Sequence, residues 1–273
     1  MFLKRLLKNK LGLIGAAVIL INILVAVFAP LLATHDPLKI DVINQGALPS
    51  EEHYFGTDEY GRDTFSRVIY GTRISLYISV LSVLVAATLG ILLGSLAGYY
   101  GGWTDNLIMR VVDAIMSFPA ILLAIGIMAM LGGNMYNVVL ALGFVYIPWF
   151  ARVVRGSVLS IKEKEYIEAA QAMGAGDLTI LFRHILPNCM APVIVQATAA
   201  LAYAILAEAA LSFLGLGTPP PAPSWGNILS DARNFMMDNA LMTIFPGIAI
   251  TLAVLGFNLL GDALRDLLDP RLK

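Results

Sequence analysis

Six long apolar stretches constrain the fold of this chain more than any other feature, because about 20 apolar residues suffice for a helix to cross the hydrocarbon of a membrane. Of the 273 residues, 58% are hydrophobic and 14% are charged, whereas soluble domains carry about 25% charged residues. The expected spans are Leu11–Leu32, Ile74–Gly98, Val111–Leu131, Val138–Val154, Pro192–Leu214 and Leu241–Gly261. The sequence therefore predicts an all-α integral membrane protein with six helices in the lipid bilayer.

The first span follows a basic segment that contains Lys4, Arg5, Lys8 and Lys10. A secretory signal peptide also begins with basic residues, but its apolar region has only ~7–15 residues and precedes a cleavage site of small residues. The apolar stretch here is longer, and no clear cleavage site follows it. We therefore expect an uncleaved membrane helix.

The distribution of Lys and Arg predicts the orientation, because cytoplasmic loops of membrane proteins carry an excess of these residues. With the N-terminus inside, 13 of the 18 basic residues fall on the cytoplasmic side. The remaining five are Lys39, Arg62, Arg67, Arg73 and Arg233. Both chain termini, and the polar insert between the fourth and fifth spans, are therefore expected in the cytoplasm.

That polar insert, Glu165–Pro187, has the residues of two short helices and a turn. Glu165–Met173 consists mostly of good helix formers. Gly174 suits the left-handed turn that ends helices. Asp177 is expected to cap a second helix, Leu178–His184. The insert thus predicts a helical hairpin at the membrane surface, either an interfacial amphipathic hairpin without a partner or a docking element.

Small and acidic residues recur in the insert at fixed positions: Glu168-Ala169-Ala170, then Gly174, then Leu186-Pro187. This pattern resembles the EAA loop of ABC importer permeases. The run Arg183–Asn188 is similar to the dipeptide, oligopeptide and nickel branch of that family. The resemblance implies a six-helix type I ABC importer transmembrane domain whose cytoplasmic coupling helix docks in a groove of an ATPase. The docking residues would be Glu165, Glu168, Ala169, Ala170, Met173, Gly174, Asp177, Leu186 and Pro187.

The chain contains no G-x-x-x-x-G-K-[ST] loop with which to bind ATP phosphates. The resemblance accordingly implies that the chain binds no cofactor itself and that ATP and Mg²⁺ bind to two separate ATPase subunits. It also implies a homologous second permease subunit, an extracytoplasmic substrate-binding protein and a location in the plasma (inner) membrane of a bacterium or archaeon. The substrate would be a di- or oligopeptide, or a related small solute such as nickel.

The resemblance suggests two parts: residues 1–73, a membrane helix with an extracytoplasmic segment, and residues 74–273, a transport core with its coupling loop at 162–187. Within the first part, Gly56-Thr57-Asp58 and Gly61-Arg62-Asp63 are again similar to the peptide and nickel branch. A following apolar face of Phe65, Val68, Ile69 and Thr72 predicts a helix lying along the interface.

Four residues are candidates for the side that meets the binding protein: Arg62, Asp63, Arg67 and Trp225. For the first three, the alternative is a set of local ion pairs that stabilises the segment. For Trp225, the alternative is the common role of tryptophan as an anchor at the headgroup level.

Charged residues inside spans are costly and usually face the bundle interior or water. Glu208 is the candidate pathway residue, although a packed, hydrogen-bonded glutamate is an equal alternative, and a proton-coupled secondary transporter would also explain it. Asp113 is expected to pair with Arg110 one turn away. Asp262 is expected, with Arg265, only to cap the cytoplasmic end of the last span.

Composition argues against several other classes. The net charge of −1 gives no basic stripe for nucleic acid. The single cysteine, Cys189, excludes an internal disulfide, and His35, His53 and His184 are scattered along the chain, so no metal site is expected. No H-E-x-x-H or G-x-S-x-G motif supports an enzyme, and no loop resembles the selectivity filter of a channel.

Overall fold

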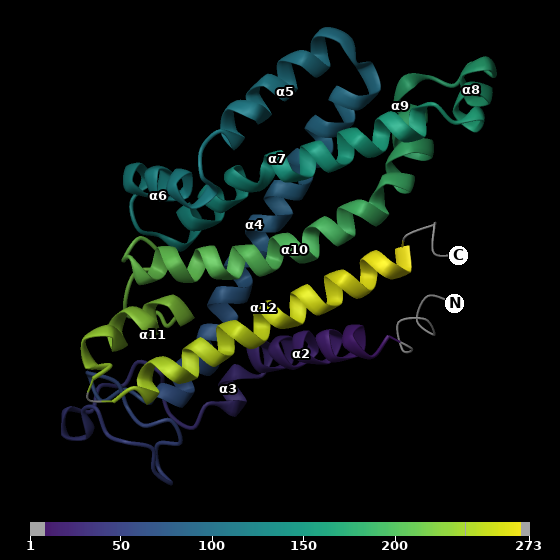
Figure 1. Cartoon of the computed structure of the whole chain (residues 1–273). Coiled ribbons are helices and arrows are strands. Elements are labelled where there is room, and N and C mark those ends of the chain that lie inside the picture. Colours follow the sequence, from purple (N-terminus) through teal and green to yellow (C-terminus); the bar gives the residue numbers. More distant parts are fainter. Residues whose placement is uncertain (1–8, 238, 269–273) are drawn as a thin grey trace.

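Long helices running side by side form the molecule (Figure 1), and the computed structural model describes residues 9–237 and 239–268. Five helices are long and apolar enough to cross a membrane, counting α10 together with the short helices that precede it. They are α2 (Lys10–Val27), α4 (Thr64–Tyr100), α7 (Met135–Lys162), α10 (Leu186–Phe213) and α12 (Leu241–Leu268). A bent pair, α5 (Gly102–Met116) and α6 (Ala120–Leu131), occupies the place of the third expected span. The predicted all-α membrane fold is confirmed.

Shorter elements connect these helices. They are α3 (Ala29–Leu32), η1 (Val42–Asn44), α8 (Glu165–Ala172), α9 (Asp177–Thr179), the π-helix η2 (Ile180–Ile185), α11 (Trp225–Ala232) and η3 (Arg233–Phe235). In Figure 1, α8 lies at one end of the bundle, while α3, α11 and the loop before α4 lie at the other end.

The third span is not the single helix Val111–Leu131 that hydropathy predicts. The chain turns by 87° between α5 and α6. Pro119 is the capping residue immediately before α6. Proline disfavours helical geometry in the residue before it and cannot donate a backbone hydrogen bond. The local sequence Ser117-Phe118-Pro119 therefore interrupts an otherwise apolar stretch.

The predicted interfacial helix at Phe65–Thr72 is also not a separate element. It forms the first turns of α4, which continues without a break through residue 73 to Tyr100. Val68, Ile69 and Thr72 are buried against other parts of the protein. The apolar face at these positions is thus an internal packing face, which has the same periodicity as a lipid-facing one.

Three glycines on one face of α4 allow α7 to approach very closely. They are Gly90, Gly94 and Gly98, spaced four residues apart. A β-carbon on Gly94 would lie 2.4 Å from the backbone oxygen of Ala151, and one on Gly90 would lie 2.4 Å from the β-carbon of Phe150. Small residues promote this kind of helix contact in membranes, where tight packing replaces the hydrophobic effect.

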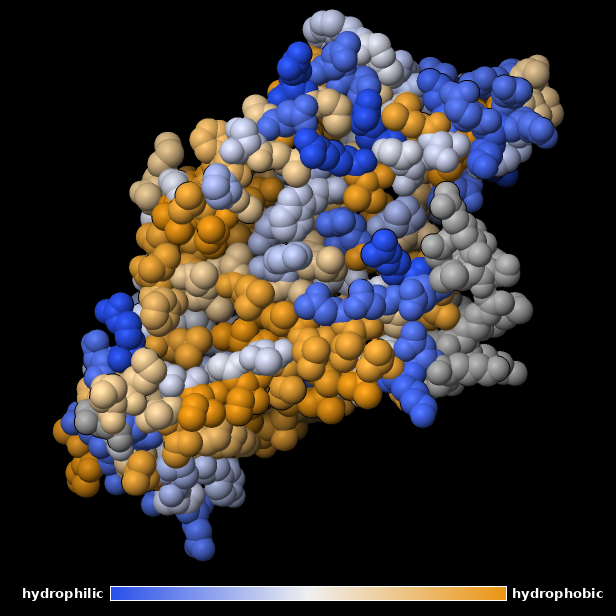
Figure 2. Space-filling model, viewed as in Figure 1, coloured by the Kyte–Doolittle hydropathy of each residue, from blue (hydrophilic) through white to orange (hydrophobic). Residues whose placement is uncertain are grey.

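Exposed apolar side chains cover the middle of the bundle. Figure 2 shows hydrophobic surface along the mid-length of the helices and hydrophilic surface over the end that carries α8. On α2, for example, Leu11, Leu20 and Ile21 are more than half exposed. A helix that is apolar on its outer face suits lipid rather than water.

We expect Gly94→Ala to lower the thermal stability of the detergent-purified chain, because the added methyl group collides with the backbone of α7. Overpacking of this kind costs about 1–3 kcal/mol. The matched control is Gly126→Ala in α6, where a β-carbon would meet nothing within 4 Å. Equal melting temperatures for both variants would contradict the close α4–α7 contact.

Candidate functional site

Helix α8 and the turn after it form an exposed projection at one end of the bundle (Figure 1). The predicted helix is confirmed, ending at Ala172, one residue earlier than expected, and Gly174 has the predicted left-handed conformation with φ of +81°. Glu168, Ala169 and Met173 are exposed, and Met173 is 82% exposed. The projection thus offers a large apolar side chain and carboxylates to a partner.

One side of α8 packs inward. Ile167 is completely buried and Ala170 is only 4% exposed. Of the two alanines expected among the docking residues, Ala169 is exposed and Ala170 is buried. Ala170 instead lies on the side of α8 that packs against the rest of the protein.

The second helix of the insert is not the separate element Leu178–His184. Gly176, not Asp177, is the capping residue, and α9, η2 and α10 follow one another without a loop. Ile180, Leu181 and Ile185 of η2 are buried. π-Helical turns inside longer helices occur frequently at functional sites, and this one joins the projection to the fifth span. Leu186 is half-buried and Pro187 exposed in the first turn of α10, a turn that tolerates proline.

Polar contacts attach the projection to the ends of α4 and α7. The hydroxyl of Tyr99 donates a hydrogen bond to Oδ1 of Asp177 over 2.9 Å. Nζ of Lys162 donates to the backbone oxygen of Tyr99 over 3.0 Å. Tyr99 therefore links the end of α4 to Asp177, at the start of the segment that follows the turn.

At the opposite end, two arginines and two aspartates form a buried ion-pair cluster that joins the loop before α4 to α11. Nε of Arg62 lies 2.6 Å from Asp58 Oδ2, and Nε of Arg67 lies 3.3 Å from the same oxygen. The Nη2 atoms of both arginines lie 3.0 and 3.2 Å from Asp231 Oδ2. Burial raises the pKa of Asp231, and Arg67 and Arg62 oppose that rise.

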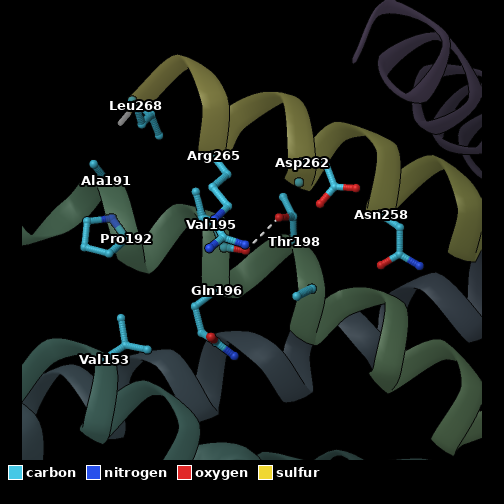
Figure 3. Close-up of a pocket in the computed structure, with 12 residues that line it drawn as sticks. Val153, Ala191, Pro192, Val195, Gln196, Thr198, Asn258, Asp262, Arg265 and Leu268 are labelled. Carbon is cyan, nitrogen blue, oxygen red and sulfur yellow. Dashed lines mark hydrogen bonds between the residues drawn. The ribbon is translucent and has the colours of Figure 1, made fainter. Parts of the chain in front are cut away.

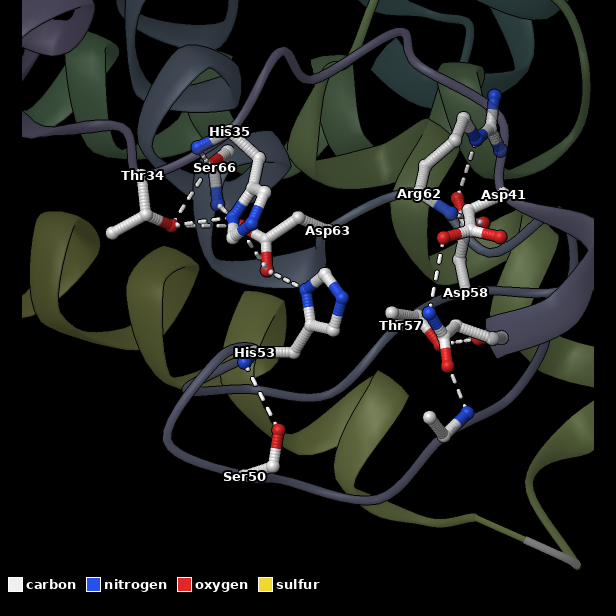
Figure 4. Close-up of polar contacts among 12 residues, drawn as sticks. Thr34, His35, Asp41, Ser50, His53, Thr57, Asp58, Arg62, Asp63 and Ser66 are labelled. Carbon is white, nitrogen blue, oxygen red and sulfur yellow. Dashed lines mark hydrogen bonds and ion pairs between the residues drawn. The ribbon is translucent and has the colours of Figure 1, made fainter.

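The local ion pairs considered for this segment are therefore present, but with different partners. Asp63 pairs with neither arginine; its Oδ2 accepts from the backbone N–H of Ser66 and caps α4. Figure 4 shows Arg62 beside Asp58, apart from Asp63. Arg62, Asp63 and Arg67 are all less than 9% exposed. Their side chains therefore stabilise the interior of this end of the molecule and contribute little to its surface.

The expected anchoring role of Trp225 is wrong. The side chain is completely buried, and its Nε1 donates to the backbone oxygen of Val68 over 3.1 Å. Gly71 provides the space, since a β-carbon there would lie 3.0 Å from the indole ring. Trp225 thus packs α11 against α4.

Glu208 is fully buried in α10 and hydrogen-bonded. The hydroxyl of Ser75 in α4 donates to its Oε2 over 2.8 Å, and the hydroxyl of Ser212 donates to its Oε1 over 2.8 Å. Ser75 Oγ also accepts from the backbone N–H of Trp225. This network joins α4, α10 and α11, and it corresponds to the packed, hydrogen-bonded alternative.

Asp113 does not pair with Arg110 as expected. Its Oδ1 lies 2.5 Å from Nη2 of Arg152 in α7, and both side chains are about half exposed. Arg155, one turn further along α7, makes a bidentate pair with Asp105 over 2.5 and 2.6 Å. The two arginines therefore connect α7 to α5.

A pocket of about 640 Å³ with a mainly apolar lining lies between α10 and α12 (Figure 3). Its polar lining includes Gln196, Asn258, Asp262 and Arg265. From the sequence, Asp262 and Arg265 are assigned only to the end of the last span, and Asn258 is overlooked. The missed signal was the spacing: Asn258 and Asp262 are four residues apart, and Asp262 and Arg265 are three apart, which places all three on one face of a helix.

Comparisons with known proteins agree with this architecture. Residues 90–273 match the family described as binding-protein-dependent transport system inner membrane component, and residues 1–49 match the N-terminal transmembrane domain of oligopeptide transport permease C. The chain is 49% identical over 270 residues to the dipeptide transport system permease protein DppC of Alkalihalophilus pseudofirmus, covering 99% of this chain and 89% of that protein. It is 47% identical over 275 residues to the glutathione transport system permease protein GsiD of Pectobacterium atrosepticum, covering 100% and 91%.

A similar fold occurs in the inward-facing MetNI methionine ABC transporter, with a TM-score of 0.61 at 20% identity over 74% of this chain and 96% of that one. The fold is that of a type I ABC importer transmembrane domain, a permease rather than an enzyme. The chain belongs to the family of binding-protein-dependent transport system inner membrane components.

We expect Tyr99→Phe to loosen the projection without unfolding the bundle, because it removes only the hydrogen bond to Asp177. A hydrogen bond of this kind contributes about 1 kcal/mol, so amide hydrogen exchange across residues 165–185 should accelerate about fivefold. Tyr100→Phe is the matched control, since Tyr100 is 51% exposed. Unchanged exchange in Tyr99→Phe would contradict the attachment.

Proposed function

We propose that the chain forms half of the translocation pathway of an ATP-driven importer for di- or oligopeptides. The observation that carries this proposal is the exposed α8 projection in a membrane bundle of the importer family. The peptide substrate class is supported by the relatives, which are named as dipeptide and glutathione permeases. The other half of the pathway would come from a homologous second permease subunit.

The α8 projection would dock in a groove of an ATPase subunit. Short amphipathic helices bind in grooves through a few anchoring side chains. Met173 would be the apolar anchor, and Glu165, Glu168 and Ala169 would line the contact. Gly174 would set the angle between α8 and the segment that begins at Asp177, while Ala170, Leu186 and Pro187 would support the projection from the bundle side.

ATP and Mg²⁺ would bind to two ATPase subunits and draw them together, each carrying a docked projection. The movement would reach α4 through Tyr99 and α10 through η2. ATP can drive alternating access in this way only if the nucleotide-bound ATPases hold the outward-open and inward-open conformations with different affinity. The pocket between α10 and α12 would form part of the pathway on the α8 side.

An extracytoplasmic binding protein would deliver substrate at the opposite end, near the cluster of Asp58, Arg62, Arg67 and Asp231. Of these, Asp58, Arg62 and Arg67 are buried, as are Asp63 and Trp225, and they would keep that end rigid rather than touch the partner. Glu208 would contribute to the pathway only indirectly, by holding α4, α10 and α11 together. No observation favours a proton-coupled transporter.

We further propose cytoplasmic termini in a plasma membrane, from the Lys and Arg distribution. Lys4, Arg5, Lys8, Arg271 and Lys273 lie outside the described residues, whereas Arg155, Lys162 and Lys164 lie near the α8 end. Residues 1–73 would be an N-terminal addition to a transport core, 74–273, that contains the coupling loop 162–187. The separate matches to residues 1–49 and 90–273 support this division.

Co-purification tests the proposed docking. We expect the tagged chain, expressed with its neighbouring transport subunits, to bring down an ATPase and a second permease. Glu168→Lys should abolish recovery of the ATPase, because charge reversal in an interface opposes binding. Glu51→Lys, an equally exposed glutamate at the opposite end, is the control. Full recovery of the ATPase with Glu168→Lys would place the docking surface elsewhere.

Coupling depends on the conformation of Gly174, and two glycines of the same turn allow a matched test. A β-carbon would meet nothing within 4 Å at either Gly174 or Gly176, but only Gly174 has positive φ. Alanine in the left-handed region costs roughly 1–2 kcal/mol, so Gly174→Ala should reduce ATP-dependent peptide uptake by roughly 5–30-fold. Gly176→Ala should keep uptake near the unaltered level. Equal uptake by both variants would remove the proposed role of the turn.

A further inference from the structure

Two histidines that are far apart in the sequence meet at the end of the molecule opposite α8. The ring centroids of His35 and His53 lie 4.7 Å apart, with the ring planes tilted by 35°. His35 follows α3, and His53 lies in the loop before α4. These two histidines are separated along the chain but adjacent in the fold, and Figure 4 shows their surroundings.

Each ring uses Nδ1 for a contact within the protein. Nδ1 of His53 lies 2.9 Å from Oδ1 of Asp63, and Nδ1 of His35 lies 3.0 Å from the hydroxyl oxygen of Thr34. The carboxylate of Asp63 accepts hydrogen bonds, so Nδ1 of His53 carries the hydrogen and Nε2 keeps its lone pair. A carboxylate on one ring nitrogen is the usual device that orients a metal-binding histidine.

Asp63 is held in place independently of any ligand. Its side chain is 1% exposed, and its other oxygen accepts from the N–H of Ser66 at the start of α4. Ser66 Oγ also accepts from the backbone N–H of His35. Capping of α4 explains the position of Asp63, but it does not require two imidazoles beside each other at this point.

A carboxylate completes the cluster. Glu52 is exposed, and the ligand atoms offered by His35, His53 and Glu52 all lie within 4.8 Å of one another. Tetrahedral zinc with bonds near 2.0–2.1 Å needs ligand atoms about 3.3 Å apart. Closing the difference requires rotation of the Glu52 side chain, which is exposed, and of the His35 side chain, which is 31% exposed.

We propose that His35, His53 and Glu52 bind a divalent transition-metal ion of the zinc class, with Asp63 as the residue that orients His53. Two imidazoles and one carboxylate suit zinc and similar first-row ions, whereas calcium and magnesium prefer oxygen ligands alone. Water would occupy the fourth position. The bound ion would tie the segment after α3 to the loop before α4 and stiffen this end of the bundle.

Titration of the purified full-length chain with zinc chloride tests the site, after treatment with a chelator and with a purification tag that contains no histidine. We expect saturable binding of one ion, and a melting temperature that rises with zinc concentration because the ion binds only the folded chain. Glu52→Gln and His35→Ala should each weaken binding about tenfold or more, by analogy with the 10–100-fold losses caused by altering the partners of metal ligands. Glu52→Gln changes an exposed side chain, so it keeps the fold intact.

The control is His184→Ala, because His184 lies at the α8 end, and it should bind zinc as the unaltered chain does. Absence of zinc binding would overturn the proposal. So would binding that Glu52→Gln and His35→Ala leave unchanged, or binding that only His184→Ala abolishes. The test requires no transport activity, so its outcome is independent of the proposed function.

Discussion

The close contact between α4 and α7 is the interaction on which the rest of the structure depends. It exists because Gly94 and its neighbours on the same face leave no side chain between the two backbones. α4 spans 37 residues, which at 1.5 Å per residue makes it about 55 Å long. One end of this helix is capped by Asp63 and the other carries Tyr99, which holds the projection after α7. A single packed helix pair therefore joins the two functional ends of the molecule.

The chain has no loop with which to bind nucleotide phosphates, and in the proposed mechanism the energy reaches it as movement of the docked projection. The arrangement suits this requirement. The projection is exposed where a partner can reach it, yet Ile167 and Ala170 fasten it to the bundle. At the far end, two buried arginines shared between Asp58 and Asp231 bind the loop before α4 to α11. In the proposed mechanism, these contacts and the long helix α4 would pass movement from one end of the molecule to the other.

The sequence predicted features that depend on local physics. Hydropathy found the spans because lipid demands long apolar helices. Helix propensity and the glycine turn located α8 within one residue. The family resemblance predicted that this insert docks on a partner, and that role stays a prediction. Each of these predictions rests on residues that are close together in the sequence.

The remaining features depend on tertiary neighbours, which no local pattern reveals. The face at Val68 packs inward although its periodicity also fits an interfacial helix. Trp225 is buried because Gly71, far away in sequence, makes room for it. Asp113 pairs across helices with Arg152 rather than along its own helix. His35 meets its neighbouring imidazole only when the loop folds back on the start of α4.

The most direct test of the account is a cross-linking measurement from the tip of the projection. Cys189 is buried and would first be replaced by serine, after which Met173→Cys supplies one exposed thiol. In membranes that contain the whole transporter, a short thiol-reactive cross-linker should join this residue to the ATPase subunit, with a yield that changes when ATP is added. A thiol that reacts only from the extracytoplasmic side, or that cross-links to no ATPase in either nucleotide state, would contradict the central claim that α8 couples ATP hydrolysis to transport.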